Sequence, residues 1–197
     1  MPFLMLRNDI TKVTADAIVN PENQNLLQGS GTSRAIYQAA GEQELTAACE
    51  AIGHCEPGKA VCTPAFGLPA KYIFHAVCPA WHGGFFGEAK QLAGAYHSAL
   101  ELAAEYHSES VAFPLLSSGN YGYPKEQAFR DAVKEAARFG ISSDRAARFE
   151  NDAQGVAVNY HVVSETVSRM REAPCCASIG AEWKEQIEAD FQKRHHG

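Results

Sequence analysis

The sequence predicts an α/β fold in which helices cover both faces of a mixed, mostly parallel sheet. Short apolar segments alternate with segments of helical periodicity, which is the order that β-α-β units produce. Residues 111–116 form an almost continuous apolar run, which is typical of a strand covered on both faces. The composition, 46% hydrophobic and 20% charged, is that of an ordinary globular domain, and 197 residues suffice for a full core.

Strands are expected where short apolar runs lie between turn residues. These runs are residues 3–6, 17–19, 59–63, 72–77, 111–116 and 156–163. Helices are expected where apolar residues recur every three or four positions. These segments are residues 33–40, 42–52, 88–106, 164–171 and one that begins at Pro124. Gly41 and Gly53 end the first two helices, and the fixed φ of Pro124 suits the first turn of another.

The long helix over residues 88–106 has a clear apolar stripe, and the chain beyond residue 139 has a weaker pattern. The stripe consists of Leu92, Tyr96, Ala99, Ala103 and Tyr106. Residues 142–155 are polar and aperiodic, which is long for a connection inside a compact domain. We therefore expect one domain over residues 1–172, followed by a tail or short helix over residues 173–197.

Charge and cysteine usage exclude several classes of function. Seventeen Lys and Arg against 23 Asp and Glu give a net charge of −6 without a basic run, which argues against nucleic acid or an anionic membrane as partner. No run approaches the roughly 20 apolar residues of a membrane span, and the N-terminus lacks a signal-peptide pattern, so a cytoplasmic location is expected. The six cysteines form no CxxC pair, which favours reduced thiols and argues against a metal site. No cofactor is expected.

Two glycine-containing loops carry the candidate chemistry. They span residues 20–33 and 117–124, and each runs from a predicted strand toward a predicted helix. Ligands of open α/β sheets bind outside the carboxyl ends of the strands, where helix N-termini offer free N–H groups to phosphate. Neither loop has a Walker or GxGxxG pattern. The loops predict a diphosphate held from two sides by backbone N–H groups, and two plain glycine-rich turns are the alternative.

The loops and their flanking motifs together resemble the macrodomain family of ADP-ribose-binding modules, in particular MacroD-type bacterial members. The matching segments are residues 8–11, 16–20, 35–36, 39–41, 58–60, 68–75, 83–84, 113–114 and 121–124, with Asn23, Trp81, Ser117 and Gly119. The resemblance covers residues 4–139. It implies a three-layer α/β/α macrodomain whose partner is ADP-ribose or an ADP-ribosylated protein, and we expect a monomer.

The resemblance also implies binding roles for individual residues. Asp9 would accept a hydrogen bond from the adenine amino group with the Ile10 backbone beside the ring, although an Asp before a Thr is also an ordinary turn residue. Asn23 would contact the distal ribose. One side of the diphosphate would be lined by Gly29, Ser30 and Gly31. The other side would be lined by Ser117, Ser118, Gly119, Asn120 and Tyr121, of which Tyr121 has a core aromatic as its alternative role.

The sequence departs from the hydrolytic members at the end of the first loop. Those relatives place an Asp where this chain has Ser33, and that carboxylate handles the attacking water. A serine hydroxyl cannot act as a carboxylate base, so Ser33 and Asn23 are candidate catalytic residues only as groups that orient a water. Gln28 and Ser30 replace glycines of the family, and Glu22 is the nearest carboxylate to Asn23.

Two residues near the loops are interpreted as structural. His75 lies in a predicted strand and matches a strand histidine of the family. Tyr37 stands in the first predicted helix, where many members have a histidine, and it is interpreted as a packing residue.

These features leave the enzyme question open between several hypotheses. The favoured one is a module that binds ADP-ribose or mono-ADP-ribosylated protein. The alternative is a weak mono-ADP-ribosyl-protein hydrolase or O-acetyl-ADP-ribose deacetylase, for which Ser33→Asp is expected to raise turnover. A phosphatase acting on a related phosphoester, such as ADP-ribose-1″-phosphate in Appr-1-p processing, and a macrodomain that binds nothing are the remaining hypotheses.

Overall fold

The computed structural model describes residues 3–138 and 158–163, and it contains the strands and helices predicted over these ranges. The strands are β1 (Phe3–Arg7), β2 (Ala17–Glu22), β3 (Ala60–Pro64), β4 (Tyr72–Val77), β5 (Ser110–Pro114) and β6 (Val158–Val163). The helices are the 3₁₀-helix η1 (Ile10–Lys12), α1 (Thr32–Ala40), α2 (Glu42–Ile52), α3 (Glu88–Glu105) and α4 (Lys125–Arg138). The helix expected over residues 164–171 and the tail after residue 172 lie outside the described residues.

The described strands form one six-stranded mixed sheet with the order β1-β6-β5-β2-β4-β3. The three strands β5, β2 and β4 are parallel neighbours. Antiparallel pairs join β1 to β6, β6 to β5 and β3 to β4. Four of the six strands, β1, β2, β4 and β5, therefore point the same way, and the predicted fold class is confirmed.

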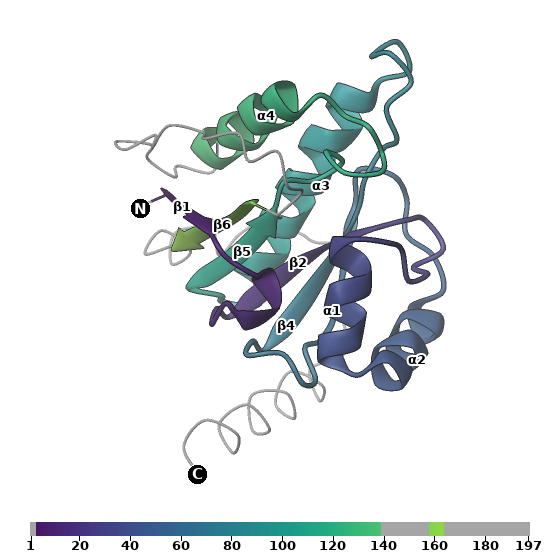
Figure 1. Ribbon diagram of the computed structural model, residues 1–197, viewed down its shortest axis with the longest axis vertical. Helices are drawn as coiled ribbons and strands as arrows, with labels where there is room; N and C mark the ends of the chain where they lie inside the picture. Colours follow the sequence, from purple (N-terminus) through teal and green to yellow (C-terminus); the bar gives the residue numbers. More distant parts are fainter. Residues whose placement is uncertain (1–2, 139–157, 164–197) are drawn as a thin grey trace.

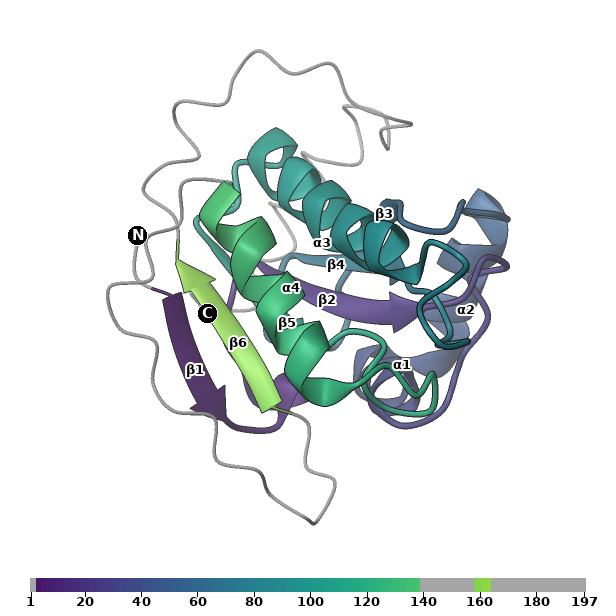
Figure 2. The ribbon, with the colours of Figure 1, turned by 90° about the horizontal axis from the view of Figure 1, so that it is seen from above.

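Helices cover both faces of the sheet, with α1 and α2 on one face and α3 and α4 on the other (Figures 1 and 2). Successive side chains of a strand point to opposite faces. In β2, Ala17 and Val19 accordingly pack with the α3 side, whereas Ile18 packs with the α1 side. In β4, Phe74 and Ile73 divide between the two cores in the same way.

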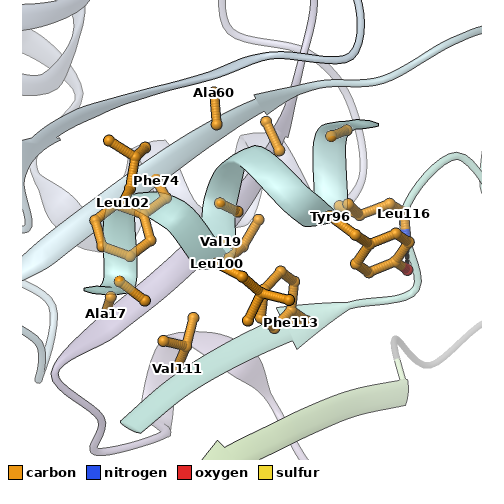
Figure 3. Packing of buried hydrophobic residues seen from close by; sticks show 14 of the residues in the cluster. Ala17, Val19, Ala60, Phe74, Tyr96, Leu100, Leu102, Val111, Phe113 and Leu116 are labelled. Atoms are coloured by element: carbon orange, nitrogen blue, oxygen red, sulfur yellow. Dashed lines mark hydrogen bonds between the residues drawn. The ribbon is translucent and has the colours of Figure 1, made fainter. Parts of the chain in front are cut away.

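The core under α3 follows the stripe predicted from the sequence. All five stripe residues are buried, and they pack on the apolar side chains of β2, β4 and β5 (Figure 3). Strand β5 ends at Pro114, two residues earlier than predicted. Leu116 is nevertheless fully buried, and its N–H donates to the Tyr96 hydroxyl at 3.1 Å. The apolar run therefore reflects burial that continues beyond the strand.

Strands β2 and β5 flank the point where the strand order reverses. The chain leaves β2 toward β4 on one side, and after β4 it crosses to β5 on the other side of β2. Ligands of open α/β sheets bind outside the carboxyl ends of the strands at such a point. The connections that follow β2 and β5 are residues 23–31 and 115–124. The second includes the predicted loop over residues 117–124, whereas the predicted loop over residues 20–33 also takes in the end of β2 and the start of α1. None of the helices in the described part of the chain is both long and apolar enough to cross a lipid bilayer.

Candidate functional site

The connections after β2, β4 and β5 meet at one edge of the sheet. The Asn120 amide donates to the Ser30 hydroxyl, so the two predicted loops contact each other directly. The connection after β4 lies beside the second loop, because the Trp81 N–H donates to Tyr121 O at 2.7 Å and the Ser117 hydroxyl donates to Pro79 O at 2.9 Å. The structure thus brings together the two loops that the sequence singled out.

Asn23 organises the first half of the first loop. Its Nδ2 group donates to Glu22 Oε1 at 3.1 Å and to Leu27 O at 2.5 Å. Its Oδ1 atom accepts the N–H groups of Asn25 and Leu27 at 3.1 and 3.3 Å. An amide side chain offers two donors and about two acceptor sites, so these bonds use its ordinary capacity. The longest of the four bonds is the one that the Leu27 N–H donates.

The second half of this loop leads into the N-terminus of α1. Gly31 precedes the helix with φ 58° and ψ −123°, a backbone conformation that residues with a side chain rarely adopt. Space is not the constraint, because a Cβ at this position would meet no atom within 4 Å. Ser33 is buried, and its hydroxyl accepts the Gly29 N–H at 3.0 Å. No side chain caps the start of α1, so its first N–H groups stay available to an anion at this edge. Ser33 therefore holds the backbone of the glycine loop at Gly29.

The second loop begins in a strained conformation. Ser117 has φ 62°, an uncommon value for a residue other than glycine, and such values concentrate at functional sites. The turn that follows is closed by Gly122 N–H donating to Gly119 O at 2.9 Å, and the Ser118 hydroxyl donates to Leu115 O at 2.8 Å. Gly119 and Asn120 are exposed at the tip of this turn.

Tyr121 is half-buried beside this turn and packs against the core under α3. Its ring therefore serves the core in part, as the alternative interpretation expected. Burial, and then the neighbouring Cys78 and Glu22, raise the pKa of the Tyr121 hydroxyl. The hydroxyl is therefore neutral at physiological pH.

Asp9 and Ile10 come from a third element. The Asp9 carboxylate caps η1 by accepting the Thr11 N–H at 3.0 Å and the Thr11 hydroxyl at 2.7 Å, so the turn role is present. These bonds, followed by the charge of Lys12, lower the pKa of Asp9 although partial burial opposes them. The exposed carboxylate is thus an ionised acceptor. Ile10 is buried, and η1 lies beside α1 and β5.

The comparisons with known proteins identify the family. The family model of the Macro domain matches residues 19–132, more than half of the chain. The chain belongs to the macrodomain family. Its relatives include a macro domain-containing protein of Chlorobaculum tepidum, 48% identical over 65% of this chain and 74% of the relative. Another is an O-acetyl-ADP-ribose deacetylase of Klebsiella pneumoniae, 47% identical over 68% of this chain and 79% of the relative.

Solved structures of macrodomains with nucleotides are similar as well. The Oceanobacillus iheyensis macrodomain with ADP has a TM-score of 0.64 and 32% identity, and the match covers 70% of this chain and 80% of that chain. The Trypanosoma brucei macrodomain in complex with ADP-ribose has a TM-score of 0.62 and 34% identity, covering 67% of this chain and 54% of that chain.

A buried polar cluster lies under the first loop of this macrodomain. It contains Asn20 and Glu22 of β2, Tyr37 of α1, Cys49 of α2, Thr63 of β3 and His75 of β4, all of them buried. Sequence reasoning treated His75 as structural and Tyr37 as packing, and it named Glu22 only as the nearest carboxylate to Asn23. The alternation of side chains along a strand could have revealed the cluster. It places Asn20, Glu22 and His75 on the same face of the sheet, the one that α1 and α2 cover.

A second buried carboxylate, Glu88, was missed. It accepts the N–H groups of His82, Gly84 and Phe86 at 3.0, 3.1 and 2.7 Å. Burial raises the pKa of Glu88, but hydrogen bonds from backbone N–H groups outweigh this and leave it below its usual value. Glu88 thereby holds the glycine-rich segment 81–87 in place beside the second loop.

Metal ligands and disulfides complete the description of the site. Over residues 3–138 and 158–163, no group of three or more His, Cys, Asp or Glu side chains is placed to hold a metal ion. Cys49, Cys55, Cys62 and Cys78 are buried, and none of these four forms a disulfide among the described residues. Cys175 and Cys176 lie outside the described residues.

Proposed function

We propose that this macrodomain binds ADP-ribose, either free or attached to a protein, between its two loops. The observation that carries the proposal is the contact between Ser30 and Asn120, which joins the loops after β2 and β5 where the strand order reverses. Two peptide segments that meet at this point present backbone N–H groups and the N-terminus of α1 toward one ligand position, which suits a diphosphate. The macrodomains with ADP and with ADP-ribose among its structural relatives support the same ligand.

Within this proposal, each part of the ligand has its own residues. Asp9 and the Ile10 backbone take the adenine, and Asn23 takes the distal ribose. The diphosphate and distal ribose lie along Gly29, Ser30 and Gly31 on one side. On the other side they are enclosed by Ser117, Ser118, Gly119, Asn120 and Tyr121. The ionised Asp9 carboxylate supports its assignment, because an exocyclic amino group needs an acceptor.

Calorimetric titration of ADP-ribose into the purified protein tests the proposal. We expect a micromolar dissociation constant, about −8 kcal/mol, which is weakened at least about tenfold by Asp9→Ala. Because Asp9 also caps η1, thermal unfolding of the variant shows whether the loss comes from unfolding. AMP, which carries the adenine but lacks the distal ribose, should bind more weakly than ADP-ribose. Absence of heat with a folded wild-type protein would refute the proposal.

Hydrolysis is the second candidate function, and the relatives named O-acetyl-ADP-ribose deacetylase favour it. In this case Asn23 and Ser33 orient a water without a carboxylate base. Turnover of O-acetyl-ADP-ribose and of a mono-ADP-ribosylated carrier protein tests it. We expect Ser33→Asp to raise turnover, because a carboxylate can accept the proton of the attacking water, which a serine hydroxyl cannot. Loss of cleavage in Asn23→Ala without any gain in Ser33→Asp would show that the base lies elsewhere.

We further infer that the protein acts as a monomer and has no nucleic-acid partner. The net charge of −6 supports the second point, because a general positive field is lacking. Sedimentation analysis with and without ADP-ribose tests the first point, with a single species near 21.3 kDa as the expected result.

A further inference from the structure

The Glu22 carboxylate stands between the buried polar cluster and the first loop. Glu22 is the last residue of β2, and its side chain is 1% exposed. The Oε2 atom faces inward and accepts Asn20 Nδ2 at 2.7 Å and the Tyr37 hydroxyl at 3.2 Å. The Oε1 atom faces the loop and accepts the Asn23 Nδ2 group and the Asn23 N–H at 3.1 and 3.3 Å. One carboxylate therefore links the core to the loop.

The Oε2 atom of Glu22 is paired with His75. His75 Nδ1 lies 3.5 Å from Glu22 Oε2, and His75 Nε2 lies 2.9 Å from the Thr63 hydroxyl, which itself donates to Pro64 O. Burial lowers the pKa of His75, but hydrogen bonds and charges from Cys49 and Glu22 outweigh it and raise the pKa to about 9. Asn20 Nδ2 also lies 3.2 Å from His75 Nδ1. A protonated His75 offsets part of the cost of removing the Glu22 carboxylate from water.

The Oε1 atom of Glu22 determines the orientation of the Asn23 amide. A carboxylate only accepts hydrogen bonds, so the NH₂ group of Asn23 must face Glu22. The Asn23 oxygen then faces the loop, where it accepts the Asn25 and Leu27 N–H groups. Asn20, on the other side of the carboxylate, also turns its NH₂ group to Glu22, and its buried Oδ1 atom has no partner among the described residues. The Glu22 carboxylate thus sets the orientation of both amide groups.

Tyr37 ties the same cluster to the end of this turn. Its hydroxyl lies 3.0 Å from Leu26 O, and Leu26 is itself buried in the left-handed conformation with φ 54°. The turn over residues 23–27 is therefore held at both ends by groups that contact Glu22.

We propose that Glu22 is a positioning residue of the candidate site, which fixes the Asn23 amide and the turn over residues 23–27 against the distal ribose of ADP-ribose. The proposal rests on the proposed function for its ligand.

Calorimetry with two ligands tests the proposal in the full chain. ADP carries the adenine, the proximal ribose and the diphosphate but lacks the distal ribose. Glu22→Gln keeps the side-chain shape, but its amide removes the charge and one acceptor oxygen. We expect it to weaken ADP-ribose binding about tenfold, the effect of one hydrogen bond to a charged group, and to change ADP binding less than about twofold. Glu50→Gln, exposed on α2, is the matched control and should change neither.

A second variant and a second measurement keep the test decisive. Glu22→Asp retains the charge beside His75 but shortens the reach to Asn23, so it should show the same selective loss even if Glu22→Gln folds poorly. In both variants, hydrogen exchange of the Asn25 and Leu27 N–H groups should accelerate relative to wild type. Equal weakening of ADP and ADP-ribose, or no weakening in folded variants, would overturn the proposal.

The two proposals fail in distinguishable ways. If the wild-type protein binds neither nucleotide, the proposed function fails, while the exchange measurement still decides whether Glu22 holds the turn. If the wild type binds ADP-ribose and exchange at Leu27 is unchanged in both Glu22 variants, the positioning role fails alone.

Discussion

The two faces of the sheet are built differently, and adjacent residues of β4 show the contrast. Phe74 is fully buried under α3 among aromatic rings, with Tyr72 and Tyr106 at centroid distances of 6.3 and 6.1 Å. His75 is equally buried, but it lies under α1 and α2 in the polar cluster with Glu22. The apolar face supplies stability through burial. The face under α1 and α2, which we call the polar face, has an apolar core as well. It differs in carrying the buried Glu22 and His75 behind the loop that follows β2.

The largest expected effect comes from the apolar face. Phe74→Ala removes a fully buried ring from between β4 and Tyr106, and we expect a loss of about 3–5 kcal/mol in the free energy of unfolding. Urea unfolding at pH 7 measures it. The loss should be the same at every pH, because the ring does not titrate. A loss below about 1 kcal/mol would show that this core collapses around the cavity.

The polar face should make the free energy of unfolding depend on pH. The pKa of His75 is raised from its ordinary 6.5 to about 9 in the folded protein, because Cys49 and Glu22 outweigh the effect of burial. The folded state therefore binds the proton more tightly than the unfolded chain does. The resulting stabilisation is complete below about pH 6.5, falls as the pH rises toward 9 and is absent above it, a change of about 3 kcal/mol.

Urea unfolding between pH 6 and pH 9.5 measures this change. The titratable groups that face His75 are Glu22, Tyr37 and Cys49. Burial and the neighbouring Cys49 and Glu22 raise the pKa of Tyr37 well above its usual range, so this hydroxyl does not titrate here. Glu22→Gln should reduce the fall in stability, whereas Phe74→Ala and Glu50→Gln should keep it. A wild-type stability that is constant from pH 6 to 9 would mean that His75 is neutral.

This contrast also explains what could be predicted from the sequence. The strands and helices were found because apolar spacing reports burial directly, as the stripe from Leu92 to Tyr106 shows. The loops were found because glycines mark positions where the backbone needs freedom, such as Gly31. The polar cluster was not predicted, because the contacts of Asn20 and Glu22 with His75 depend on the register between β2 and β4, which lie far apart in the sequence. The hydrogen bonds of Asn23 could not be predicted either, because they depend on the backbone conformation of the turn over residues 23–27.

A smaller effect is expected at the junction between the polar face and the glycine loop. Ser33→Ala removes the acceptor of the Gly29 N–H, and we expect a loss of about 1 kcal/mol in the free energy of unfolding. Ser33→Thr, which keeps the hydroxyl, is the control and should lose less. Chemical denaturation of the three proteins measures the difference. An unchanged stability in Ser33→Ala would indicate that water replaces the hydroxyl, and that the loop is held mainly by Asn23.

The smallest effect on stability should come from the contact that carries the proposed function. Asn120 and Ser30 are exposed, so Asn120→Ala should change the free energy of unfolding by less than about 0.5 kcal/mol. The same change separates the two loops, so bound ADP-ribose should dissociate several times faster, since changes at an interface act mainly on the dissociation rate. Stopped-flow displacement measures this rate, with Glu50→Gln, exposed on α2, as the control. An unchanged rate would mean that each loop holds the ligand independently, and the Ser30–Asn120 contact would then be incidental to binding.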